Sequence, residues 1–156
     1  MSDEKFMRLA IAKAREGLKK GQTPFGACIV KNGEVISCAH NVVWLTTDIT
    51  AHAEVHAIRE ACKKLNRVDL SGCTIYSTCE PCPMCFSAIH WAKISRIVFG
   101  ARIGDAQQGG FNELSISNEE MKRLGHSPVE IVADFMRAEN VAVFEEWRKS
   151  ESRKVY

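Results

Sequence analysis

Hydrophobic and polar positions alternate along the chain with two different periods, which predict helices and strands in turn. The first segment has helical spacing and ends before Gly21; its apolar positions are Met7, Ala10, Ile11, Ala14 and Leu18. Residues 25–31 and 34–40 are rich in strand formers, and only Asn32-Gly33 separates them. Because both central positions of a two-residue turn need a positive φ, Asn-Gly predicts a tight hairpin between two strands.

Beyond the hairpin, the same patterns predict an alternation of helices and strands. They place helices at about residues 52–65 and 81–92, and strands at residues 73–78 and 96–100. The second of these helices begins with proline, whose missing N–H is not needed in the first turn of a helix.

The last third of the chain has weaker patterns. Ser117 and Glu120 form a capping box, which predicts a short helix that ends at Gly125. Residues 129–132 have the composition of a fifth strand, and the apolar positions near the C-terminus predict a last helix; they are Val141, Phe144 and Trp147. Helices that alternate with strands after an opening hairpin imply an α/β domain with a mixed sheet.

Composition and charge narrow the class of protein. The 156 residues fit one domain, and 46% hydrophobic with 26% charged residues is the balance of an ordinary globular protein. Lys and Arg number 21 against 19 Asp and Glu, so the chain lacks the basic excess of a dedicated nucleic-acid domain. The acidic start has no signal-peptide core, and no apolar run reaches the roughly 18 residues that cross a bilayer. We therefore expect a single cytoplasmic domain.

The seven cysteines are an odd number in a chain without an export signal. This combination favours a reducing compartment, where cysteines bind metals or pack in the core and do not form disulfides.

Three residues have the spacing of a metal site. His52 opens one predicted helix, and Cys82 and Cys85 lie in a Cys-x-x-Cys pair at the start of the next helix. Imidazole nitrogen and thiolate sulfur are preferred zinc ligands, and a helix N-terminus stabilises a thiolate over a thiol. The sequence therefore predicts one zinc ion held by these residues.

Other metal sites explain the pattern less well. A ferredoxin-type iron–sulfur run needs a further cysteine after Cys85, and a zincin needs its glutamate directly after the first histidine, where Ala53 stands. The main alternative is a structural zinc closed by Cys79 as fourth ligand, in a non-catalytic binding module. Glu54 argues against it, because hydrolytic zinc chemistry needs a base beside the water and a structural zinc does not.

The combination His52-Ala53-Glu54 with Pro81-Cys82-Pro83-Met84-Cys85 is the two-part signature of the zinc nucleobase deaminases. From about Pro24 to Gly100 the chain resembles the cytidine-deaminase-like superfamily. The resemblance implies a three-layer α/β/α sandwich with a central mixed five-stranded sheet, and one zinc per chain.

The resemblance also implies a mechanism. A bound zinc ion lowers the pKa of water from about 15.7 towards 7, so that hydroxide forms at neutral pH. Glu54 would accept the proton of that water, pass it to a ring nitrogen, and later protonate the amino group that leaves as ammonia. The residue should be essential for turnover and dispensable for metal binding.

Within the superfamily, the chain is most similar to bacterial guanine deaminases, which form xanthine and ammonia. The similarity lies in Pro24-Phe25-Gly26-Ala27, in the two metal stretches, in Ala88-Ile89-His90-Trp91-Ala92 and in a chain that ends with Tyr156. The tRNA adenosine deaminases share the metal motif and are the first alternative. Two departures leave guanosine and other aminopurines or aminopyrimidines open: Ile49 stands where this group often has proline, and the group can have the shorter aspartate in the place of Glu113.

This likeness implies a set of substrate-binding residues. Asn41 would hydrogen-bond the base, and Glu113 would face the guanine edge. Phe25 and Trp91 would form walls of the pocket, and Tyr156 would also contribute to it. Each also has a plainer interpretation: Asn41 as a cap, Phe25 and Trp91 as core residues, Glu113 as a surface carboxylate and Tyr156 as a frayed terminus. The likeness further implies a homodimer, in which the C-terminal segment at about residues 137–156 can be exchanged between subunits. The expected ligand is a small purine, with neither membrane nor, outside the tRNA alternative, nucleic acid as partner.

Overall fold

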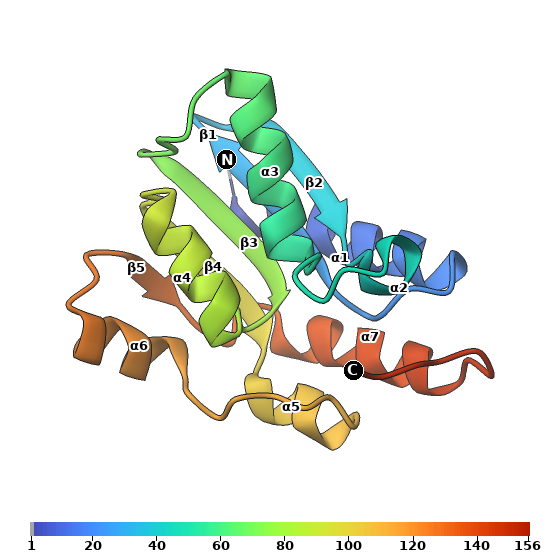
Figure 1. Ribbon diagram of the computed structural model, residues 1–156. Helices are drawn as coiled ribbons and strands as arrows, with labels where there is room; N and C mark the ends of the chain where they lie inside the picture. The colour runs from blue at the N-terminus through green and yellow to red at the C-terminus, as the bar shows by residue number, and fades with distance from the viewer. Residues whose placement is uncertain (1) are drawn as a thin grey trace.

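The computed structural model describes residues 2–156, and a five-stranded sheet forms the centre of this part of the chain (Figure 1). Its strands lie in the order β2-β1-β3-β4-β5. The opening hairpin pairs antiparallel and β1 pairs antiparallel with β3, whereas β3, β4 and β5 run parallel. The strands are β1 (Gly26–Lys31), β2 (Glu34–His40), β3 (Cys73–Cys79), β4 (Arg96–Ala101) and β5 (Glu130–Val132).

Helices cover both faces of the sheet, which makes three layers (Figure 1). Successive strand residues point to opposite faces. In β1, Cys28 and Val30 pack with α1 (Asp3–Lys19), while Ala27 and Ile29 join the cluster formed with α3 (Ala53–Leu65) and α4 (Pro83–Trp91). The last helix, α7 (Arg137–Arg148), packs beside α1 and β4. The expected α/β/α sandwich with a mixed sheet is confirmed.

The predicted hairpin turn is also present. Asn32 and Gly33 both have positive φ, at 50° and 79°, and Lys31 pairs with Glu34 across the turn.

One expectation about the cysteines is wrong. The hairpin register places Cys28 opposite Cys38 with their Cα atoms 4.1 Å apart, and the two form a disulfide. Cross-strand neighbours on the same face of a sheet come close enough to form a disulfide. The number of cysteines alone does not reveal which of them are such neighbours. The other cysteines of residues 2–156 are free thiols.

Three short helices complete the fold between these elements. The sequence patterns predict α6 (Asn118–Gly125) but neither α2 (Val43–Thr46) nor α5 (Ile103–Gln108), which are too short to show a helical period. The segment from α5 to α6 runs along one edge of the molecule and passes the ends of β3 and α4 (Figure 1). Within residues 2–156, no helix combines the length and apolar character needed to span a membrane.

Candidate active site

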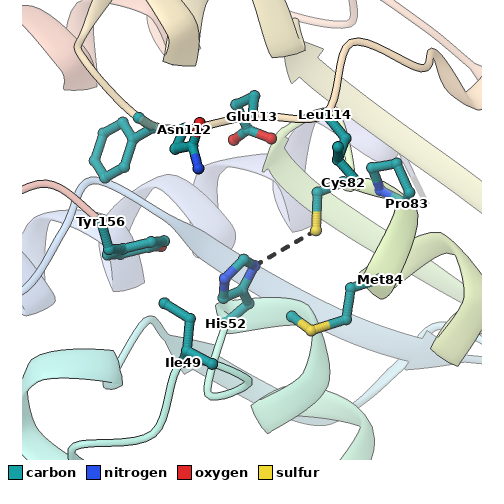
Figure 2. A pocket seen from close by; sticks show the side chains of 10 residues that line it. Ile49, His52, Cys82, Pro83, Met84, Asn112, Glu113, Leu114 and Tyr156 are labelled. Atoms are coloured by element: carbon teal, nitrogen blue, oxygen red, sulfur yellow. Dashed lines mark hydrogen bonds between the residues drawn. The ribbon is translucent and has the colours of Figure 1, made fainter.

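Three potential metal ligands meet where two helices begin. His52 is the N-cap residue of α3 and Cys82 is the N-cap residue of α4, with Cys85 one turn into the same helix. Nδ1 of His52 lies 3.6 Å from Sγ of Cys82 and 3.6 Å from Sγ of Cys85. The three ligand atoms lie within 4.8 Å of one another and could hold a metal ion (Figure 2).

The chemistry of this donor set fits zinc. A hydrogen bond from the thiol of Cys85 lowers the pKa of Cys82 to about 4, so that one sulfur is a thiolate at neutral pH. The same hydrogen bond, together with burial, raises the pKa of Cys85. A cation between the two sulfurs would replace this shared proton, as metal binding to thiols requires.

Cys79 is not one of these three ligands, although it is the last residue of β3 and lies nearby. Its buried thiol donates to the backbone oxygen of Arg102 at 3.5 Å. Burial raises the pKa of Cys79 well above its ordinary value, which favours the protonated thiol. In the part of the chain that the structure describes, this arrangement supports a set of three protein ligands.

Glu54 occupies the second position of α3, two residues after His52, and is only 5% exposed. Its Oε2 lies 3.4 Å from Sγ of Cys85, and its Oε1 lies 3.0 Å from the hydroxyl of Ser77 on β3. Burial raises the pKa of Glu54 above its ordinary value. A buried carboxyl group therefore lies beside the ligand cluster.

A cavity of about 320 Å³ opens onto the cluster. Its wall combines residues from three regions of the sequence: Ile49 and His52 before α3, Cys82, Pro83 and Met84 at the start of α4, and Phe111, Asn112, Glu113, Leu114 and Tyr156 from the last third (Figure 2). A deeper hollow adjoins the cavity and shares His52, Cys82, Glu113 and Tyr156 with it. Glu54, Cys79, Glu80 and Phe25 line this deeper part. The volume is in the range of small-molecule sites.

Glu113 lies in the wall of both hollows, on the segment between α5 and α6. In Figure 2 its side chain lies on the Cys82 side of the cavity, away from Tyr156. Burial, followed by the negative charge of Cys82, raises the pKa of Glu113 to about 7. The structure thus places this residue at the cavity and not on the outer surface.

Tyr156 and Asn41 meet at the same place. The Tyr156 ring packs 5.4 Å from the His52 ring and 5.1 Å from the Phe111 ring. Nδ2 of the fully buried Asn41 donates to the Tyr156 hydroxyl at 2.6 Å, and its Oδ1 accepts the N–H of Val43 at the start of α2. Asn41 therefore caps α2 and also anchors the terminal tyrosine. Tyr156 reaches the cavity of its own chain, and the exchange of this segment between subunits stays a prediction.

Phe25 and Trp91 have different positions. Phe25 lines the deeper hollow and packs edge-on against Phe111, with ring centroids 5.0 Å apart. Trp91 is 82% exposed at the end of α4, where it lines separate surface hollows with His90 and Ser127. Within this chain Trp91 does not line the cavity, because the metal ligands lie at the N-terminus of α4 and Trp91 lies at its other end.

Several residues at the site were not predicted from the sequence. Phe111, Asn112 and Leu114 line the cavity, and Glu80 lines the adjoining hollow. Ser77 contacts Glu54, and the buried Asn118 donates its side-chain amide to the oxygen of Pro81 at 2.7 Å. The one sequence signal for these residues was the position of Glu80 directly before Pro81-Cys82, beside the predicted metal ligands.

Comparison with known proteins agrees with this fold and site. Residues 1–101 match the family described as the cytidine and deoxycytidylate deaminase zinc-binding region. The chain belongs to this family, and it is a zinc-dependent hydrolytic deaminase.

Its relatives within the family act on different substrates. The chain is 39% identical to guanine deaminase of Bacillus subtilis (strain 168) over 157 aligned positions, which cover 100% of both chains. It is 46% identical to a tRNA-specific adenosine deaminase of Aquifex aeolicus (strain VF5) over 110 positions, 70% of this chain and 72% of the relative. The solved structure of guanine deaminase from Nitrosomonas europaea superposes with a TM-score of 0.86 at 27% identity, and covers 93% of this chain and 84% of that one.

Proposed function

We propose that this protein hydrolyses guanine to xanthine and ammonia. One observation carries the proposal: Glu113, His52 and Cys82 together line the cavity of about 320 Å³, and the same three residues line the small adjoining hollow that reaches Glu54. A purine in that cavity can present its amino-bearing edge to an acceptor while a ring carbon lies beside the metal ligands.

The edge of guanine explains why a carboxylate is the fitting partner. Guanine presents N1–H and an exocyclic amine as adjacent donors, and a carboxylate is an acceptor-only group with two oxygens. Adenine presents an acceptor at N1, which the ionised form of Glu113 would repel. A buried site that pairs two donors rejects bases that lack them, because its own polar atoms are then left unpaired.

The reaction also needs a metal and a proton carrier. His52, Cys82 and Cys85 would hold one zinc ion per chain, which supplies the acidity that turns water into a nucleophile at neutral pH. Glu54 would take one proton from that water as the water oxygen adds to the amino-bearing carbon, and pass this proton to a ring nitrogen. It would then carry the remaining hydroxyl proton to the amino group, which leaves as ammonia. In our proposal Phe25 and Phe111 would enclose the base, and Asn41 with Tyr156 would close the cavity.

The change Glu113→Gln tests the substrate. It keeps the side-chain length but replaces one acceptor oxygen by an NH₂ group, which opposes a donor of guanine. We expect kcat/KM for guanine, measured by ammonia release, to fall by at least about 100-fold, as in sites whose pairing with a substrate donor is broken. The zinc content should not change.

The matched control is Glu120→Gln, which alters an exposed carboxylate paired with Arg123. This variant should deaminate guanine at the rate of the unchanged protein. Guanine turnover that is unaffected by Glu113→Gln would refute the role of Glu113, and failure of the unchanged zinc protein to deaminate guanine would refute the proposed function.

The identity of 46% to the Aquifex enzyme favours one second candidate, deamination of adenosine in tRNA. The same assay with tRNA, guanosine, adenosine and cytosine compares the candidates directly. Ammonia from tRNA in the absence of any from guanine would select the second candidate. The position of Tyr156 against His52 supports the free base, since a base attached to a polynucleotide would have to pass this ring.

A further inference from the structure

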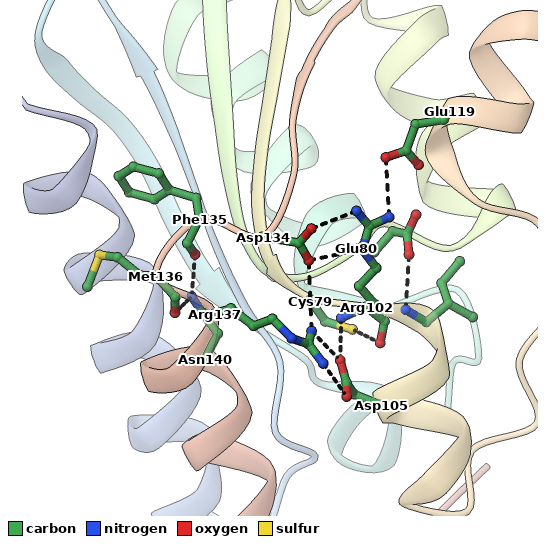
Figure 3. A network of polar contacts seen from close by, with 11 residues as sticks. Cys79, Glu80, Arg102, Asp105, Glu119, Asp134, Phe135, Met136, Arg137 and Asn140 are labelled. Atoms are coloured by element: carbon green, nitrogen blue, oxygen red, sulfur yellow. Dashed lines mark hydrogen bonds and ion pairs between the residues drawn. The ribbon is translucent and has the colours of Figure 1, made fainter.

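Glu80 is a buried carboxylate that connects two helices to the metal-binding segment. It is 5% exposed and stands between Cys79, the end of β3, and Pro81-Cys82. Its Oε1 accepts the backbone N–H of Ile103 at 3.1 Å, and its Oε2 accepts the backbone N–H of Asn118 at 2.9 Å. The position of Glu80 at the start of α5, beside Arg102, is visible in Figure 3.

These two N–H groups belong to the first residues of two successive helices, α5 and α6. The N–H groups of a first helical turn have no partner within their own helix. One carboxylate therefore satisfies a free donor on each helix, and both bonds are of the stronger, charge-assisted kind. Asn118 adds a third link, because its side-chain amide donates to the oxygen of Pro81.

The chain between the two anchored residues forms one wall of the cavity. It carries Phe111, Asn112, Glu113 and Leu114, all of which line the opening. A surrounding set of ion pairs supports α5: Arg102 contacts Asp134 and Glu119, and Asp105 contacts Arg137 (Figure 3). These pairs lie at the outer surface, where each contributes little to stability. Glu80 and the side chain of Asn118 are buried connections between this wall and the Pro81-Cys82 segment, and Glu80 alone reaches both ends of the wall.

We propose that Glu80 is a positioning residue, which sets the place of Glu113 relative to the metal ligands by holding both ends of the segment 103–118. It acts through Glu113. The inference rests on the proposed function for its kinetic test and on the hydrogen bonds alone for its structural test.

Glutamine cannot replace this function. In the Glu80→Gln variant the amide oxygen can still accept one of the two N–H groups, while the NH₂ group opposes the other donor. One end of the segment is then released. We expect amide hydrogen exchange to be at least about 10-fold faster within residues 103–118, and unchanged in α3 and β1.

The kinetic test is a double-mutant cycle with Glu113→Gln. Glu80→Gln alone should lower kcat/KM for guanine by about 10- to 100-fold, because misplacing a binding group by about 1 Å has effects of this order. In the Glu113→Gln background the same change should cost less than about 3-fold, since the interaction that it disturbs is already gone. Equal losses in both backgrounds would show a general structural role and overturn the proposal.

Two further variants keep the test decisive. Ile103→Pro removes the N–H that bonds Oε1, at a first helical position where proline is tolerated, together with part of the buried Ile103 side chain, and it replaces Glu80→Gln if that variant does not fold. It should show the same exchange pattern and the same lack of additivity with Glu113→Gln. The control Ser117→Ala removes the side-chain cap of α6, which accepts the N–H of Glu120 at 3.1 Å, and leaves Glu80 intact. Its kcat/KM should stay within about 2-fold of the unchanged protein.

The two readouts separate this inference from the proposed function. If the unchanged protein does not deaminate guanine, the proposed function fails, and hydrogen exchange still tests Glu80. If guanine is deaminated but exchange within residues 103–118 is the same in Glu80→Gln, the positioning role fails and the proposed function stands.

Discussion

Replacing Glu54 with glutamine should lower kcat for deamination by about 100- to 10,000-fold, the usual contribution of a positioned acid–base group. Glutamine has the shape of glutamate but neither accepts nor returns a proton at neutral pH. Zinc content should not change, because the ligand cluster consists of His52, Cys82 and Cys85. The variant should also be at least as stable, since the buried side chain then carries no charge and Ser77 can still donate to its oxygen.

Ammonia release, metal analysis and urea unfolding measure these three quantities. Glu60→Gln is the matched control, because it makes the same chemical change on an exposed residue of the same helix, and it should behave like the unchanged protein. Activity of Glu54→Gln within about 3-fold of the unchanged protein would contradict the catalytic role, given the size expected of such a group. Loss of zinc from the variant would instead identify Glu54 as part of the metal site.

Removing the metal should have an effect of similar size. Dialysis against a chelator, or the change Cys82→Ala, should lower kcat by at least about 1,000-fold, because the zinc ion contributes several kcal/mol to the reaction. The melting temperature should fall as well, since a ligand that binds only the folded state stabilises it. Adding zinc back should restore the chelated protein but not Cys82→Ala.

Cys62→Ala is the control for the cysteine variant. Cys62 is a free, half-buried thiol on α3 outside the ligand cluster, so its replacement should leave zinc content and activity unchanged. Full activity of the metal-free protein would contradict the account of the site. Full zinc content in Cys82→Ala would show that the metal lies elsewhere.

The fold was predictable where its signals are local. Asn32-Gly33 determines the hairpin because few other residue pairs adopt two positive φ values in succession, and Cys82-Pro83 marks the start of α4 because proline suits a first turn. The helix α5 has six residues and therefore no period to detect. The disulfide between Cys28 and Cys38 depends on the strand register, which the amino-acid composition does not contain.

The same distinction applies to the site. His52, Glu54, Cys82 and Cys85 stand in short motifs, so their grouping could be recognised without coordinates. The contacts of Glu80 span 23 residues to Ile103 and 38 to Asn118, and no spacing rule connects such positions. Trp91 belongs to the helix that carries the ligands, but at a rise of about 1.5 Å per residue the nine residues of α4 place it about 12 Å from the helix start, outside the lining of the cavity.

Zinc K-edge X-ray absorption of the purified protein tests the central claim most directly, because it counts the sulfur neighbours of the metal. We expect two sulfurs, from Cys82 and Cys85, together with two nitrogen or oxygen neighbours, and a spectrum that Cys79→Ala does not alter. Three sulfurs, with one lost in Cys79→Ala, would mean that Cys79 closes the site. That result would contradict the assignment of this zinc to hydrolysis.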